Sequence, residues 1–120
     1  MIRAAGILLM APSGRVLFLQ RSNLGDAAGQ WSFPGGKVEG DESVATAAAR
    51  ECLEETGYRV GSPGKALCRR IANGVDYTTF AKDCDEEFTP VLDQENVAFA
   101  WVSPADALGP VMPGAAVGGA

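Results

Sequence analysis

The residues best suited to chemistry are acidic side chains gathered in one stretch, from Trp31 to Tyr58. Glu51, Glu54 and Glu55 follow one another at the spacing of neighbours on one face of a helix. Carboxylates side by side repel one another, and a hard cation such as Mg²⁺, which prefers oxygen ligands, removes that repulsion. The stretch therefore offers either a metal site or an acidic helix face in contact with water. Its acidic residues are Glu39, Asp41, Glu42, Glu51, Glu54 and Glu55.

A helix must carry the three glutamates, and the sequence from Ser43 to Thr56 predicts one. The segment contains no Pro or Gly and is filled with Ala, Leu, Arg and Glu, which favour helices. Asp41 or Ser43 can cap its N-terminus, and Gly57 can end it in a left-handed conformation. One side of this helix is small enough to lie against a sheet, so we expect the carboxylate side to face outward. The small residues are Ala45, Ala48, Ala49, Cys52 and Thr56.

The residues before the helix favour the metal site. Pro34-Gly35-Gly36 predicts a tight turn where the backbone can come close to a ligand. From this turn onward the chain reads Gly36-x5-Glu42-x7-Arg50-Glu51-Cys52-x-Glu54-Glu55-x-Gly57-Tyr58. This pattern resembles the Nudix box of the Nudix (MutT-like) hydrolases, G-x5-E-x7-R-E-U-x-E-E-x-G-U, in which U is bulky and aliphatic.

Every fixed position of the box is met over residues 36–58, and the flanking Trp31-x-Phe33-Pro34 also resembles the usual entry to it. The two U positions depart from the pattern, because Cys52 and Tyr58 stand there. Both side chains are apolar enough to be buried, so we interpret the change as one of core packing.

The resemblance implies a single domain over residues 1–120 of α/β (α+β) class, with a mixed β-sheet between helices. It implies a Mg²⁺-dependent pyrophosphohydrolase, with Mn²⁺ as a substitute ion, that cleaves a diphosphate bond in a nucleoside diphosphate-linked small molecule. The small size favours a (deoxy)nucleoside triphosphate, cleaved to the monophosphate and pyrophosphate. Dinucleoside polyphosphates and nucleotide sugars remain alternatives.

The resemblance also implies roles for the residues of the box. Glu54 and Glu55 would be the main Mg²⁺ ligands, with the Gly35 or Gly36 carbonyl nearby. Glu51 would be a further ligand or the base for the attacking water.

Three more side chains would support this site by the same resemblance. Arg50 would hold Glu51 through a charge-assisted hydrogen bond. Glu42 would be an outer metal ligand or a partner of Arg50. Lys37, beside the substrate-binding glycines Gly35 and Gly36, could contact a phosphate.

Outside the box, Glu95 precedes the strand predicted over Val97–Val102. An acidic residue before an aromatic-x-Trp-Val strand resembles a family element that supplies an extra metal ligand or a catalytic base. Several aromatic side chains could stack on a nucleobase or lie in the core. They are Trp31, Phe33, Tyr77, Phe80 and Phe99.

The rest of the chain predicts short strands and turns. A first hairpin turns at Pro12-Ser13-Gly14 and a second at Asn73-Gly74, a strong two-residue turn signal. Ser22–Gln30 is predicted as a loop and Asp83–Glu87 as a solvated acidic turn. The predicted strands are Ile2–Ala11, Arg15–Arg21, Trp31–Phe33, Tyr58–Val60, Lys65–Ala72, Val75–Lys82 and Val97–Val102, with a short helix over Pro104–Leu108.

The C-terminal side is expected to be shorter than is usual for the family. Residues 109–120 hold two prolines and four glycines and no charge, so we expect a flexible tail. Either the short helix covers the second face of the sheet, or another subunit does, because large apolar patches seldom stay bare. We favour a homodimer, which a light-scattering mass of one chain at micromolar concentration would contradict.

Composition narrows the function classes. The chain has 120 residues and a net charge of −5. Because this charge is negative, we expect no general affinity for nucleic-acid polymers or membrane surfaces. Its three cysteines lack metal or disulfide spacing, and no signal peptide is visible, which indicates a cytoplasmic protein. The absence of histidine leaves acid–base and metal chemistry to the carboxylates.

Two other readings of the acidic stretch are weaker. A catalytically inactive Nudix-like binding or sensor domain usually lacks a box glutamate, and none is missing here. A calcium-binding EF-hand needs ligands at alternate positions of a loop, whereas these glutamates are predicted on a helix.

Overall fold

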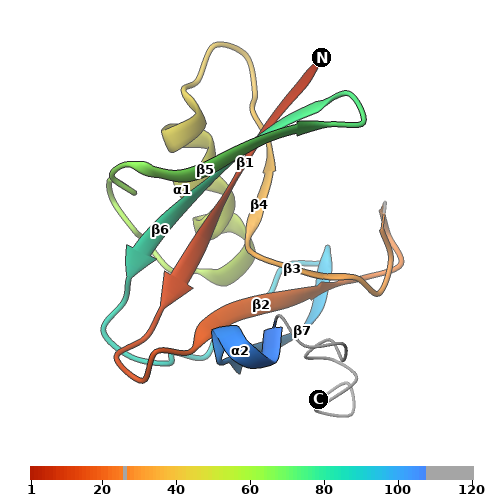
Figure 1. Ribbon diagram of the computed structural model, residues 1–120. Coiled ribbons are helices and arrows are strands. Elements are labelled where there is room, and N and C mark those ends of the chain that lie inside the picture. The colour runs from red at the N-terminus through yellow and green to blue at the C-terminus, as the bar shows by residue number, and fades with distance from the viewer. Residues whose placement is uncertain (26, 108–120) are drawn as a thin grey trace.

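A computed structural model gives the structure of the chain and describes residues 1–25 and 27–107. These residues form seven strands and two helices, with four strands before the first helix and three between the two helices (Figure 1). The strands are β1 (Ile2–Met10), β2 (Val16–Arg21), β3 (Trp31–Ser32), β4 (Gly35–Lys37), β5 (Ala66–Ala72), β6 (Val75–Asp83) and β7 (Asn96–Val102), and the helices are α1 (Val44–Thr56) and α2 (Pro104–Ala107).

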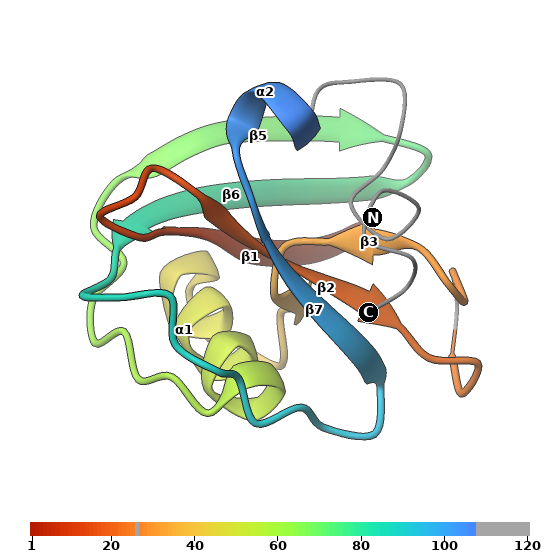
Figure 2. The ribbon, with the colours of Figure 1, turned by 90° about the horizontal axis from the view of Figure 1, so that it is seen from below.

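The strands form one mixed sheet with two parts. In one part β1 pairs parallel to β6 and antiparallel to β4, and β5 continues from β6. In the other part β2 pairs antiparallel with both β3 and β7. The two parts meet where β1 pairs with β2, and Met10 of β1 lies opposite Val16 of β2 there. The predicted hairpin is therefore present, but its strands separate at once, and Figure 2 shows the two parts diverging with α1 against β1.

Helix α1 confirms the predicted ends. Ser43 is its N-cap, with Oγ accepting from the Thr46 N–H, and Gly57 ends it with φ of 78°. Its small face packs on the sheet, where Ala47, Ala48 and Cys52 are fully buried against Ile7 and Leu9 of β1 among other core residues. The expectation that all three glutamates face outward is wrong for Glu55. Its side chain is buried, because position 55 lies on the helix between the outward face and the packed face.

The predicted turn at Pro34-Gly35-Gly36 is also wrong, since Gly35–Lys37 is the extended strand β4. The expected close approach is nevertheless present, on both sides of that strand. A Cβ atom at Gly35 would lie 2.6 Å from the Ala5 carbonyl oxygen, and one at Gly36 would lie 2.5 Å from Glu51 Oε2. Glycine is needed here to let β4 pass between β1 and α1.

Among the other predicted elements, the β5–β6 hairpin is confirmed, with Asn73 and Gly74 both at positive φ. The strand predicted over Tyr58–Val60 is absent, and the chain there forms an irregular segment that follows the end of α1. Helix α2 begins at Pro104 as predicted; the expectations for Leu108 and for residues 109–120 fall outside the described residues. Within the described part, neither helix is long and apolar enough to cross a membrane.

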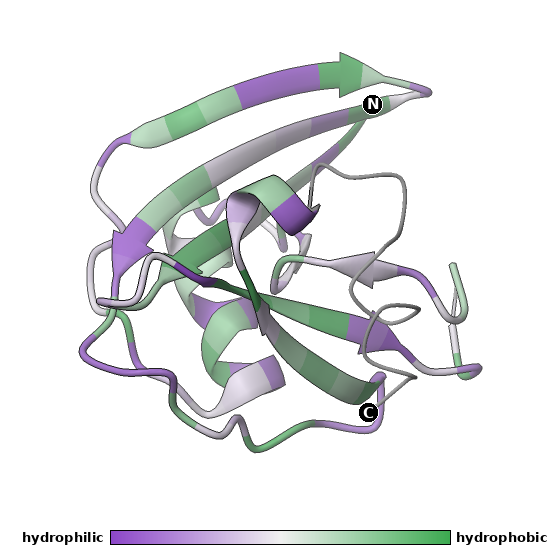
Figure 3. Cartoon of the chain, turned by 60° about the horizontal axis from the view of Figure 1, so that its bottom comes forward, coloured by the Kyte–Doolittle hydropathy of each residue, from purple (hydrophilic) through white to green (hydrophobic). Residues whose placement is uncertain are grey.

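The hydrophobic and hydrophilic residues are distributed according to this sheet arrangement. Figure 3 shows β2 hydrophobic along most of its length and hydrophilic at its end, where it carries Gln20 and Arg21. Phe80 is buried in the main core and Phe99 packs against it, whereas Trp31 and Phe33 pack on a second, smaller cluster with Phe18. The core therefore leaves a polar edge where β2, β4 and α1 come together. The cysteines Cys52, Cys68 and Cys84 are free.

Candidate active site

A cleft of about 460 Å³ lies at that polar edge. Strand β4 forms its floor, α1 one wall, and the end of β2 with the connection before β7 the other wall. Most of the residues that line the cleft were predicted as site residues. The full lining consists of Arg21, Gly25, Gly35, Gly36, Lys37, Glu39, Glu51, Glu54, Glu55 and Glu95.

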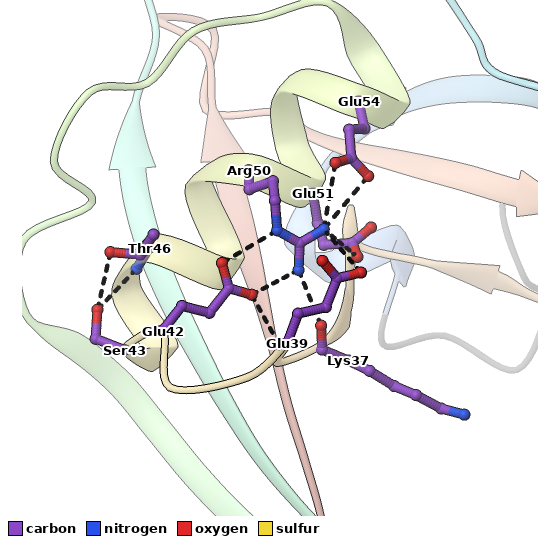
Figure 4. A network of polar contacts seen from close by, with 8 residues as sticks. All are labelled: Lys37, Glu39, Glu42, Ser43, Thr46, Arg50, Glu51 and Glu54. Carbon is purple, nitrogen blue, oxygen red and sulfur yellow. Dashed lines mark hydrogen bonds and ion pairs between the residues drawn. The ribbon is translucent and has the colours of Figure 1, made fainter.

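One set of carboxylates surrounds Arg50, and we call it the Arg50 group (Figure 4). The guanidinium donates to both oxygens of Glu42, from Nη2 at 2.7 Å and from Nε at 3.2 Å. Its Nη1 donates to Glu51 Oε2 at 3.1 Å and to Glu54 Oε2 at 3.2 Å. The fourth carboxylate, Glu39, lies 3.8 Å from Nη1. The single positive charge of Arg50 therefore holds four acids together and offsets part of their negative charge.

The Arg50 group is also tied to β4, because Nη2 donates to the Lys37 carbonyl oxygen at 3.0 Å. The Lys37 side chain itself points away from the network (Figure 4). The hydrogen bond from Arg50 lowers the pKa of Glu42, and the Glu39 backbone N–H adds to this effect. The same contact with Glu42 raises the pKa of Arg50. This group is held together by its own charges.

Glu55 is in a different situation. Its side chain is only 3% exposed, and its Oε1 accepts one hydrogen bond, from the Gly35 N–H at 3.0 Å. Burial raises the pKa of the Glu55 carboxyl to about 8; the Gly35 N–H lowers it, and the negative charges of Glu51, Asp93 and Glu95 raise it further. Burial likewise raises the pKa of Glu51, against the influence of Arg50.

Asp93 and Glu95 complete a second set with Glu55, which we call the Glu55 group. One carboxylate oxygen from each lies within 4.8 Å of the others. The ion pairs of Arg50 reach Glu39, Glu42, Glu51 and Glu54, and they include none of these three carboxylates. Three carboxylates this close together, one of them buried, offer the oxygen donors that a hard divalent ion prefers.

A sequence model of the NUDIX domain matches residues 1–117. The chain belongs to the Nudix family of hydrolases. The family model agrees with the geometry, in which the box glutamates of α1 meet the glycines of β4 in one cleft. The mixed sheet with few helices is that of a Nudix fold.

Known Nudix proteins resemble this chain over most of its length. It is 35% identical over 97 residues to the CTP pyrophosphohydrolase of Escherichia coli, a match that covers 79% of this chain and 71% of that protein. It is 35% identical over 63 residues to a putative 8-oxo-dGTP diphosphatase of Bacillus subtilis, covering 52% of this chain and 40% of the relative. The crystal structure of a MutT protein from Methanosarcina mazei superposes with a TM-score of 0.76 and 28% identity, covering 95% of this chain and 86% of that one.

Within the Nudix site, the structure brings Glu51, Glu54, Glu55 and Glu95 into one cleft, with Gly35, Gly36 and Lys37 at its floor and rim. Glu42 and Arg50 stand behind the cleft and face each other, and Glu42 has both oxygens on the guanidinium.

Sequence reasoning missed Asp93 and Arg21. Asp93 lies outside the box, two positions before Glu95, and gave no spacing signal of its own. Arg21 ends a hydrophobic strand, and only the fold shows that this end reaches the cleft.

Proposed function

We propose that the chain hydrolyses a nucleoside triphosphate to the monophosphate and pyrophosphate, with Mg²⁺ as its ion and Mn²⁺ as a substitute. The observation that carries the proposal is the Glu55 group, three carboxylates close together around the buried Glu55, which accepts from the N–H of Gly35 in strand β4. When bound, the ion neutralises phosphate oxygens, orients the diphosphate and makes water a better nucleophile.

The chain's own residues would then do the remaining work. Gly35 and Gly36 line the cleft, where the β4 backbone can meet a phosphate. Lys37, exposed at the rim, supplies a positive charge for a phosphate oxygen. Arg50 fixes the carboxylates of Glu51 and Glu54 at the cleft wall.

The reaction forms a bond from water oxygen to one phosphorus and breaks the bond between that phosphorus and the bridging oxygen. The water proton passes to a carboxylate, and Glu51 and Glu95 are the two candidates. Burial raises the pKa of Glu51 above its ordinary value, which makes its carboxylate a better proton acceptor.

Small Nudix relatives support the choice of substrate. The two relatives named above are a CTP pyrophosphohydrolase and a putative 8-oxo-dGTP diphosphatase. The substrate in each of these names is a nucleoside triphosphate. The cleft volume of about 460 Å³ is within the range of small-molecule sites. The cytoplasmic location and the homodimer stay predictions.

The test is phosphate release, after addition of a pyrophosphatase, from a panel of nucleotides with and without Mg²⁺. The panel holds unmodified and 8-oxo dNTPs, CTP, diadenosine polyphosphates, ADP-ribose and sugar nucleotides, with Glu54→Gln as a control. We expect Mg²⁺-dependent turnover of a triphosphate that falls by roughly a hundredfold or more in Glu54→Gln, because one charged donor is lost. Turnover of another class of nucleotide would mean that this class, and not a triphosphate, is the substrate. If the protein bound Mg²⁺ and nucleotide but turned over no compound of the panel, the chain would be a binding domain.

A further inference from the structure

Glu95 reaches the cleft from an irregular part of the chain. Strand β6 ends at Asp83 and β7 begins at Asn96, so Glu95 is the last residue of a long connection without strand pairing. Its side chain is exposed, and no core contact fixes it. Something else must keep its carboxylate within reach of Glu55.

The earlier part of the connection is held by bonds from Val91 N–H to the Thr56 carbonyl and from Trp101 Nε1 to the Phe88 carbonyl. Ser22, the first residue after β2, contacts the last two residues of the connection. Its N–H donates to the Glu95 carbonyl oxygen at 2.8 Å, and its Oγ donates to the Gln94 carbonyl oxygen at 2.9 Å. The same Oγ accepts from the Leu24 N–H at 3.3 Å. Ser22 is buried, although serine is mostly an exposed residue. A buried hydroxyl with both a donor and an acceptor role is well placed to fix two loops together.

A β-bulge places Glu95 opposite this serine. Gln20 pairs with Ala98, but Arg21 pairs with Asn96, so Val97 is an extra residue in β7. The Ser22–Glu95 hydrogen bond continues the shifted register by one more pair, just before β7 begins at Asn96. Bulges beside functional sites commonly re-aim a side chain. Without the extra residue, Ser22 would lie opposite Asn96, and Glu95 would be one position further from β2.

Asp93 shapes the same turn from within. Its Oδ1 accepts from the Glu95 N–H at 3.2 Å and from Asn96 Nδ2 at 3.0 Å. These bonds set the local conformation of the turn, but they join residues of that turn to one another. Ser22 is the residue whose side chain attaches the turn to the sheet.

We propose that Ser22 is a positioning residue of the cleft: its hydroxyl holds the Gln94 carbonyl against the end of β2, next to the backbone bond from Ser22 to Glu95, and so keeps Glu95 beside Glu55. This inference rests on the proposed function in one respect, the assignment of Glu95 to the cation. The hydroxyl does not touch the ion or the substrate. Its loss would loosen one donor of the Glu55 group and leave the Arg50 group unchanged.

The test compares Ser22→Ala with Ser22→Thr, which keeps the hydroxyl, and with Ser62→Ala, an exposed loop serine outside the cleft. The first readout is Mn²⁺ affinity of the substrate-free protein, measured from the free Mn²⁺ signal in electron paramagnetic resonance. We expect Ser22→Ala to bind Mn²⁺ about tenfold more weakly, because supporting contacts of metal ligands carry effects of that size. Ser22→Thr should recover most of the affinity, and Ser62→Ala should match the parent.

The second readout is amide hydrogen exchange, which does not depend on activity. Ser22→Ala should speed exchange at Glu95 and Asn96 and leave α1 unchanged, and kcat should fall more than KM rises. Parent-like Mn²⁺ affinity in Ser22→Ala would overturn the inference, as would equal losses in Ser22→Ala and Ser22→Thr. Global unfolding of Ser22→Ala would also overturn it, because the hydroxyl would then support the whole fold. If the parent protein itself bound no Mn²⁺, the proposed function would fail first and the inference with it.

Discussion

The two sets of carboxylates in the cleft differ in what balances their charge. The Arg50 group has four acids around a guanidinium that donates to three of them. The Glu55 group has three acids, and Arg50 pairs with none of them. Both sets share the same cleft, and α1 contributes to each.

The difference assigns different work to glutamates that are neighbours in the sequence. The carboxylates around Arg50 share one guanidinium, which offsets part of their repulsion when no ligand is present. A buried carboxylate next to two more acids is costly to ionise, and it gains most from an added cation. We infer that the Arg50 group is the scaffold of the site and that the Glu55 group provides the strongest pull on the ion.

The largest expected effect is on turnover. Glu55→Gln keeps an Oε1 that can accept from the Gly35 N–H but removes the buried charge. We expect kcat with Mg²⁺ to fall by roughly a hundredfold or more, since a charged donor to the ion is lost. Steady-state kinetics on the best triphosphate would measure this, with Glu86→Gln, an exposed acid outside the cleft, as the control. A rate within a few-fold of the parent would show that the Glu55 carboxylate is not a donor to the ion.

A second effect is the pH dependence of stability without metal. Burial raises the pKa of Glu55 from 4.5 to about 8, so the folded chain keeps a proton that the unfolded chain releases near pH 4.5. The stabilisation from that proton is complete below about pH 4.5 and is lost as the pH rises through about 8. In EDTA, the free energy of unfolding should fall by a few kcal/mol over this range, on the order of one kcal/mol per pKa unit. Urea unfolding at several pH values would test this, and Glu55→Gln should flatten the slope.

Stability should also expose the scaffold role of Arg50. Lysine cannot reproduce the paired donation to Glu42 together with the contacts to Glu51 and Glu54. We expect Arg50→Lys to lower the free energy of unfolding by about 1–3 kcal/mol, because half-buried acceptors lose their donors. Thermal unfolding at pH 7, with the exposed Arg59→Lys as the matched control, measures it. A change no larger than that of Arg59→Lys would count against a scaffold.

The smallest effect belongs to a surface pair with equally good geometry. Arg69 donates to both oxygens of Asp76, at 2.8 Å and 2.5 Å, but its side chain is 61% exposed. We expect Arg69→Gln to cost about 1 kcal/mol or less, because water screens exposed pairs. Thermal unfolding in low and high salt would check this. A loss as large as that of Arg50→Lys would show that burial is not what separates the two arginines.

Local sequence predicted the elements that depend on near neighbours. The helix, its Ser43 and Gly57 caps and the Asn73-Gly74 hairpin follow from residue propensities within a few positions. The box residues could be named because their spacing is fixed on one helix and the segment before it.

The errors arose where distant segments decide the outcome. Pro34-Gly35-Gly36 has the composition of a turn, but pairing with β1 makes its glycines a strand. Glu55 lies at the boundary of the helix faces, and the position of β4 buries it. Asp93 joins Glu55 across a long stretch of sequence, so no spacing rule could reveal it.

The central claim is that Glu55 provides the strongest pull on the ion, and Mn²⁺ binding tests it most directly. Calorimetric titration of the metal-free protein at pH 7.5 would compare the parent, Glu55→Gln and Glu42→Gln. We predict saturable binding by the parent, a loss of roughly a hundredfold or more in Glu55→Gln and a smaller loss in Glu42→Gln. Equal affinity in the parent and Glu55→Gln, or a larger loss in Glu42→Gln, would contradict the account.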